Sequence, residues 1–305
     1  MSRLPPVGAW LALMRISNAP TVISQVFAGV AVGMHSLGQD EIIPVGTTTL
    51  IAIGVLLTYL AGMTLNDAFD ARVDAVERPG RPIPSGAISL SMAWSVGAAM
   101  FLAGMAVLAV ASPSTMHWAL LLGLSVLAYN TLHTLTAGSF VLMAACRALV
   151  PVVAACSVSP VVEWSLLAWI AGGSFLSIAA VSVAARNEVV GFGTLARVAS
   201  WFLPIAACAP LGLWLVGGVA PRDPVQATAV LGVMALAVVS VLFGIRTAMV
   251  TKSPRAVPAA VGIWIGTIPI IDSGTCFLLG RPVLGVLCMG MWAAAQLLRP
   301  RFASS

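Results

Sequence analysis

The stretch Asn66-Asp67-Ala68-Phe69-Asp70-Ala71-Arg72-Val73-Asp74 closes a long apolar run and is soon followed by Glu77-Arg78-Pro79-Gly80-Arg81-Pro82-Ile83-Pro84-Ser85-Gly86. Only 8% of the chain is charged, yet four of its ten acidic residues fall in these two segments. If the preceding helix continues, Asp67, Asp70 and Asp74 lie at i, i+3 and i+7, which is one helical face. Three carboxylates on one face repel one another unless a cation lies between them. Hard oxygen ligands in this arrangement suit Mg²⁺.

Arginines accompany these carboxylates. Arg72, Arg78 and Arg81 are close enough in sequence to contact a phosphate beside the cation, and guanidinium matches phosphate geometry. The three prolines of 79–84 restrict the segment to extended or turn conformations. The stretch therefore predicts a combined Mg²⁺ and phosphate site.

The composition indicates a polytopic α-helical membrane protein. Of the 305 residues, 60% are hydrophobic, the mean hydropathy is +1.03, and apolar runs of about 20 residues, the length that crosses a bilayer, recur along the chain. The net charge of +5 more often sets topology in such a protein than it binds nucleic acid, so we expect no nucleic-acid partner. The five cysteines are scattered without metal-site spacing.

We expect one transmembrane domain over 1–305, with a first-motif loop at 66–86 and a second at 183–195. The predicted spans are 9–33, 45–65, 90–110, 116–135, 139–158, 165–185, 199–218 and 226–248. The stretch 256–297 is long enough for one or two more, so the bundle has about nine helices, or ten. The first 34 residues lack a clean cleavage site, so we expect them to form a retained span.

The distribution of charged residues among the loops supports this arrangement of spans. With a cytoplasmic N-terminus, most basic residues fall on the cytoplasmic side, as the positive-inside rule requires. Both motif loops land on that side, and the five acidic residues there lie in these loops alone. Arg299 and Arg301 lie inside only if 256–297 crosses twice.

The first motif resembles that of the UbiA superfamily of intramembrane prenyltransferases, which reads NDxxDxxxD and then RPxxxG. The match covers Asn66, Asp67, Asp70, Asp74, Arg81, Pro82 and Gly86. The segment Met14–Thr21, with Arg15 and Asn18, resembles the family's first helix. Tyr129–His133 stands where the family often has YxxxK, and Arg147 fits a recurrent arginine.

The second motif departs from the family pattern DxEGDxxxGxxTL. Val183 and Asn187 stand where two aspartates are expected, and Arg186 and Glu188 are the charged residues that remain. His133 replaces the family's lysine. The resemblance is thus to a divergent member. One hypothesis is that Arg186 contacts diphosphate directly and leaves a site with a single Mg²⁺.

The resemblance implies Mg²⁺-dependent transfer of a prenyl group from a polyprenyl diphosphate to an unidentified acceptor, in a cavity facing the cytoplasm of a bacterial inner (plasma) membrane. Asp67, Asp70 and Asp74 would be the metal ligands and catalytic residues. The implied diphosphate contacts are Asn66, Arg72, Arg78, Arg81, Arg147 and Arg186. The implied pocket or acceptor residues are Arg15, Asn18, Tyr129, His133, Asn187 and Glu188. Partner enzymes of a biosynthetic pathway are a further expectation.

Three other functions compete with this one. The altered second motif suggests a catalytically weakened, prenyl-lipid-binding component of a biosynthetic complex. CDP-alcohol phosphotransferases also have clustered aspartates, but the chain has no D-G-x-x-A-R. A transporter would carry its carboxylates near the bilayer midplane rather than at a loop.

Overall fold

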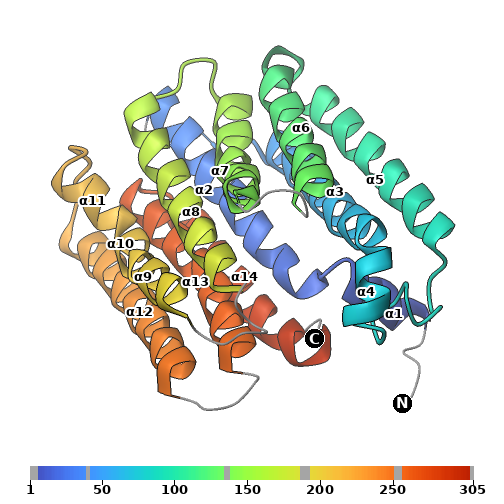
Figure 1. Cartoon of the computed structure of the whole chain (residues 1–305). Helices are drawn as coiled ribbons and strands as arrows, with labels where there is room; N and C mark the ends of the chain where they lie inside the picture. The colour runs from blue at the N-terminus through green and yellow to red at the C-terminus, as the bar shows by residue number, and fades with distance from the viewer. Residues whose placement is uncertain (1–5, 39–41, 134–137, 186–192, 251–255, 303–305) are drawn as a thin grey trace.

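The computed structural model is an all-helical bundle (Figure 1) and contains no strand in the residues it describes, which are 6–38, 42–133, 138–185, 193–250 and 256–302. In chain order the elements are α1 (Pro6–Leu13), η1 (Ile16–Asn18), α2 (Ala19–Leu37), α3 (Val45–Phe69), α4 (Ala71–Glu77), α5 (Leu90–Ala111), η2 (Pro113–Thr115), α6 (Met116–Leu132), α7 (Ser139–Val158), α8 (Trp164–Ala185), α9 (Thr194–Ser200), α10 (Phe202–Ala207), α11 (Ala209–Leu215), α12 (Pro224–Val250), α13 (Ala256–Leu278) and α14 (Pro282–Phe302).

The helices form two flanks around a central group (Figure 1). Helices α3, α5 and α6 make one flank, α9 to α12 make the other, and α2, α7 and α8 lie between them. Helix α2 packs against α7, α13 and α14, which ties the N-terminal part of the bundle to the C-terminal part. The N-terminal helix α2 and the C-terminal helices α13 and α14 therefore pack directly against one another.

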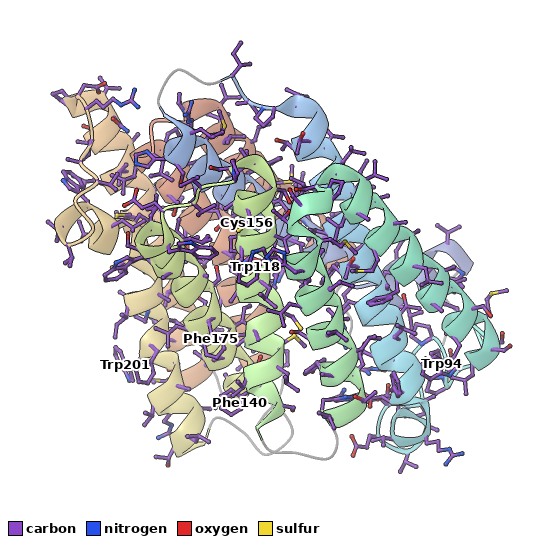
Figure 2. The ribbon with its side chains drawn as sticks, turned by 90° about the horizontal axis from the view of Figure 1, so that it is seen from above. Trp94, Trp118, Phe140, Cys156, Phe175 and Trp201 are labelled. Carbon is purple, nitrogen blue, oxygen red and sulfur yellow. The ribbon has the colours of Figure 1, made fainter. Side chains whose placement is uncertain are left out.

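Length and composition confirm the predicted membrane protein. Eight helices of the described residues are apolar and long enough to cross a bilayer, and the bent pair 194–207 with 209–215 would make nine. Large apolar side chains such as Leu102, Leu124 and Phe243 are exposed on the outer surface, as expected where helices face lipid. Figure 2 shows Trp94 and Trp201 at opposite edges of the molecule, and both side chains are exposed.

Two predicted spans were wrong in their boundaries. The span 9–33 is interrupted after Leu13, where Arg15 adopts a left-handed conformation (φ 47°), and α2 begins only at Ala19 with Pro20 in its first turn. The span 199–218 is not one helix, because its segments are bent by 49° at Cys208. Pro210 stands in the first turn of α11, where its missing N–H costs nothing.

The stretch 256–297 forms two helices, each long and apolar enough to cross a membrane. Helix α13 ends at Leu278, Gly280 takes a positive φ of 70° in the turn, and α14 begins at Pro282. A guanidinium N–H of Arg299 donates to the Ala259 carbonyl at 3.0 Å. The start of α13 and the end of α14 therefore lie at the same side of the bundle, as expected of two antiparallel helices.

Two glycines bring α2 and α7 into close contact. A Cβ on Gly29 would lie 2.5 Å from the Pro151 carbonyl oxygen, and one on Gly33 would lie 2.7 Å from that of Ala155. Small residues four apart let membrane helices approach backbone to backbone. This contact fixes the two helices that carry the central polar side chains described below.

Candidate functional site

The three aspartates of the first motif lie where α3 passes into α4. Helical hydrogen bonds continue across the junction, because the Asp70 N–H donates to the Asn66 carbonyl (3.0 Å) and the Asp74 N–H to that of Asp70 (2.8 Å). Asp67 and Asp74 are 6% and 3% exposed. The spacing predicted from the sequence therefore places two carboxylates inside the protein rather than on a solvated loop.

Arg81 joins the two buried carboxylates. Its Nη1 lies 2.7 Å from Asp74 Oδ2 and 3.5 Å from Asp67 Oδ1. Arg15 approaches Asp67 from the break before α2, with 3.4 Å between Nη2 and Oδ1. Among the described non-glycine residues, only Arg15 has a positive φ. Its carbonyl accepts a hydrogen bond from the Tyr59 hydroxyl at 3.2 Å, which holds this unusual backbone in place.

His133 pairs with the third carboxylate. Its Nε2 lies 2.8 and 3.0 Å from the two oxygens of Asp70, and the amide nitrogen of Asn66 lies 3.4 Å from the same ring nitrogen. The hydrogen bond to Asp70 raises the pKa of His133 above its ordinary value. The Tyr129 ring stacks on the imidazole, with centroids 5.2 Å apart. His133 thus belongs to the aspartate cluster.

An apolar cavity lies beside this cluster, between α2, α3, α6 and α7. It holds about 550 Å³ of space, counting its open side. Its polar lining includes Tyr59, Tyr129, Asn130 and Arg147. The remaining lining residues are Val22, Val55, Thr58, Gly62, Met63, Leu122, Val126, Met143, Cys146 and Val150. Since Tyr59 also contacts Arg15, the cavity adjoins the ion pairs.

Arg147 is the buried cation of this cavity. It is 9% exposed, and it donates to Gln25 Oε1 at 3.0 Å and to the Thr21 hydroxyl. Gln25 Nε2 finds no hydrogen-bond partner among the residues that the structure describes. A guanidinium inside a membrane bundle is costly and marks function by default. Arg147 is held by α2 and presented to the cavity.

The donor set suits a hard cation, although in the described residues no three acidic, histidine or cysteine side chains converge as a preformed metal centre. Asp67 and Asp74 converge instead on one guanidinium nitrogen of Arg81. Positive charge therefore fits between these carboxylates. Mg²⁺ usually binds one or two carboxylates and completes its shell with water and substrate phosphate, so Asp67 and Asp74 are suitable ligands if Arg81 turns away.

Other predicted residues are placed differently. Arg72 and Arg78 are exposed, and neither forms an ion pair with the described carboxylates. The side chain of Asn18 interacts with the Tyr59 hydroxyl. Arg186, Asn187 and Glu188 lie outside the described residues. Their roles remain predictions.

Sequence reasoning missed several polar side chains that the fold brings inward. Tyr59 and Gln25 contact Arg15 and Arg147 as described above, and the Asn130 amide donates to the Gly62 carbonyl at 3.1 Å. Asp272, inside α13, is 4% exposed. The available signal was simple, because each is a polar residue within a largely apolar stretch, and such residues usually face the bundle interior.

The model of the UbiA prenyltransferase family matches residues 22–261, which include the first motif, the cavity-lining helices and Arg147. The chain belongs to the UbiA prenyltransferase family.

Two relatives and two solved structures agree with this membership. The protein named digeranylgeranylglyceryl phosphate synthase from Methanoregula boonei is 37% identical over 123 residues, which is 40% of this chain and 42% of that protein. Its namesake from Methanothrix thermoacetophila is 44% identical over 77 residues, 25% of this chain and 28% of that protein. These matches span less than half of each relative.

The structural neighbours cover more of the chain. The apo UbiA homologue from Aeropyrum pernix K1 has a TM-score of 0.62 at 19% identity, and the likeness covers 83% of this chain and 96% of that one. The Archaeoglobus fulgidus homologue bound to GPP and Mg²⁺ has a TM-score of 0.52 at 16% identity, over 90% and 99%. At these identities the likeness establishes the fold, which confirms the predicted UbiA-like bundle.

Proposed function

We propose that this protein is a Mg²⁺-dependent intramembrane prenyltransferase, which binds a polyprenyl diphosphate at the aspartate cluster and transfers its prenyl group to an acceptor. The observation that carries the proposal is that a charged cluster lies next to an apolar cavity. The buried carboxylates, which pair with the long side chains of Arg15 and Arg81, adjoin an apolar cavity. Tyr59, Tyr129 and Arg147 belong to the lining of this cavity. A prenyl diphosphate has the same two-part chemistry.

The chain's own residues account for departure of the diphosphate. Arg15 and Arg81 are each paired to a carboxylate and lie at the cluster, so they can turn to phosphate oxygens when Asp67 and Asp74 bind the cation. Bound Mg²⁺ would supply charge stabilisation for the leaving diphosphate. Preorganised donors at developing negative charge give the largest part of such catalysis.

The cavity walls protect the electrophile. The carbon–oxygen bond to diphosphate breaks as the acceptor's bond to the allylic carbon forms, and the proton that the acceptor loses passes to the released diphosphate. Water would capture the allylic carbon if it entered. The apolar lining from α2, α3, α6 and α7 excludes water. The two tyrosine rings offer aromatic faces to positive charge developing on the prenyl group.

The acceptor and the membrane orientation are finer proposals. The names of the matched relatives indicate products built on glyceryl phosphate, so a glyceryl phosphate lipid with a free hydroxyl is the first acceptor to test. The positive-inside pattern supports a cytoplasmic aspartate cluster in a plasma membrane. We also propose that the reaction supplies a multistep lipid pathway.

Turnover of radiolabelled geranyl, farnesyl and geranylgeranyl diphosphates by purified protein tests the function. We expect Mg²⁺-dependent, acceptor-dependent release of diphosphate, lost in D67N and D70N and retained in E77Q, whose exposed carboxylate lies at the end of the adjoining short helix α4. Full activity of D67N would refute the metal assignment. Tight donor binding without release would instead support the lipid-binding component, to which apolar Val183 in α8 already points.

A further inference from the structure

Asp272 is a buried carboxylate to which the proposed reaction assigns no task. It lies within α13, a helix apolar enough to span a membrane, and it is 4% exposed. A second cavity, which Asp272 lines between α8, α11 and α13, has room for about one water molecule. A substrate in that cavity therefore does not account for the carboxylate. An acidic side chain inside a membrane bundle is costly and usually has a function.

Asp272 and Arg147 contact the same turn of α2 from two different helices. Arg147, on α7, donates to the Thr21 hydroxyl and to Gln25 Oε1. Asp272, on α13, accepts a hydrogen bond at 2.6 Å from the hydroxyl of Ser24, which lies between those two residues in the sequence. The three side chains of α2 are completely buried. This turn of α2 therefore stands between a buried cation and a buried anion.

The two charges attract each other without forming an ion pair. Asp272 is the one carboxylate among the described groups whose charge acts on Arg147. Neither side chain takes part in a salt bridge in the described part of the chain. Attraction at a distance therefore offsets the charge of Arg147.

The direct partners of Arg147 are neutral. Its hydrogen bonds to Thr21 and Gln25 use two of the five N–H donors of a guanidinium. The side chain also lines the first cavity. The remaining donors are thus available to an anionic ligand in that cavity.

We propose that Asp272 is a positioning residue that acts through Arg147, as a counter-charge held at the same turn of α2 but out of contact. A carboxylate bonded directly to the guanidinium would occupy the N–H donors that an anionic ligand needs. Without any counter-charge, the buried guanidinium would strongly destabilise the fold. Separation of the two charges by α2 avoids both outcomes. The identity of the anion as the diphosphate of a prenyl donor rests on the proposed function.

Loss of the charge of Asp272 should strengthen anion binding in the first cavity. In D272N the amide oxygen can still accept from Ser24, so the variant removes the charge and keeps the shape. Attraction across one helix diameter of about 10 Å, at an effective dielectric constant of about 20, corresponds to about tenfold in affinity. D272N should therefore bind farnesyl thiodiphosphate, an unreactive donor analogue, about tenfold more tightly. D272E, which keeps the charge, should restore wild-type affinity.

Calorimetry on full-length protein in nanodiscs measures these affinities. S24A is the matched control, because it removes the hydrogen bond to Asp272 and keeps both charges, so its affinity should equal that of the wild type. A merely structural role would weaken binding in D272N. Weaker or unchanged binding in that variant would therefore overturn the proposal, and so would an equal gain in S24A.

Melting temperatures test the pairing without any ligand. D272N and R147M should each melt lower than the wild type, because each leaves one buried charge uncompensated. The double variant D272N/R147M should melt higher than R147M, since neither charge is then present. A double variant that melts below both single variants would overturn the pairing. Wild-type protein that binds no prenyl diphosphate, while the double variant recovers stability, would refute the proposed function alone.

Discussion

Arg81 provides a sharp test of the site, because its removal should change two affinities in opposite directions. Its Nη1 contacts Asp74 at 2.7 Å and Asp67 at 3.5 Å, so it stands where a cation between these carboxylates would stand. In R81Q the two carboxylates lose that partner and attract Mg²⁺ more strongly. The same variant lacks a guanidinium for the diphosphate.

The magnitudes follow from the contacts. The side chain of Arg81 is 12% exposed and that of Asp74 4%, so solvent screens the pair only partly. A charge-assisted hydrogen bond of this kind contributes about 1.5–3 kcal/mol, and the longer contact to Asp67 less than about 1 kcal/mol. Release of that competition should tighten binding of Mg²⁺ alone by about tenfold or more. Loss of a phosphate donor should reduce transfer by about 100-fold.

Calorimetry of Mg²⁺ binding without donor, and turnover with donor, measure the two effects on the same preparation. R246Q is the matched control, because Arg246 is exposed on α12, distant in sequence from the cluster, and both readouts should stay at wild-type values. Unchanged or weaker Mg²⁺ binding in R81Q would refute the claim that the guanidinium occupies the metal position. Unchanged turnover would refute its role toward diphosphate.

Three further predictions concern the helices around the cluster. R147M should lower transfer by about 100-fold, as measured by product formation, and should also lower the melting temperature, because it leaves the buried carboxylate of Asp272 without the positive charge that faces it. G29L should lower the melting temperature, because the new side chain meets the α7 backbone and overpacking costs about 1–3 kcal/mol; G46A, with open space around it, should not. His133 has a raised pKa in the folded protein, so its contact with Asp70 stabilises fully below the ordinary value of about 6.5 and is lost as pH rises through the folded-state pKa. In EDTA, H133Q should therefore lower the melting temperature more at about pH 5.5 than at about pH 8.5, and an equal loss at both would contradict the contact.

The apolar runs predicted most of the helices, because a membrane helix must satisfy its backbone internally and shows this need in a long apolar stretch. The breaks were harder to predict. Arg15 and Pro20 lie inside a run that stays apolar on both sides, so the sequence alone did not separate α1 from α2. Pro210 gave a similarly weak signal within 199–218.

The candidate site likewise has features that the sequence predicted and features that it did not. The spacing of Asp67, Asp70 and Asp74 is a local property, and local helical geometry carried it into the fold. Their partners are not local, since Arg15 and His133 reach them only when separate helices pack together. No periodicity in one segment encodes such pairing, which is why the ion pairs emerged only from the structure.

Buried polar side chains are concentrated on some helices of the bundle and are lacking from the described buried residues of others. A chain of contacts leads from Asp67 through Arg15 to Tyr59 at the first cavity, and Arg147 in the same cavity leads through α2 toward Asp272. All of these residues except Arg15, which precedes α2, belong to α3, α7 or α13, and the second link is made by the hydroxyls of α2. By contrast, every described residue that is buried on α5 or α12 is apolar or glycine. An unpaired polar group in a membrane costs free energy. The internal helices therefore carry polar side chains where hydrogen-bond partners or ligands satisfy them.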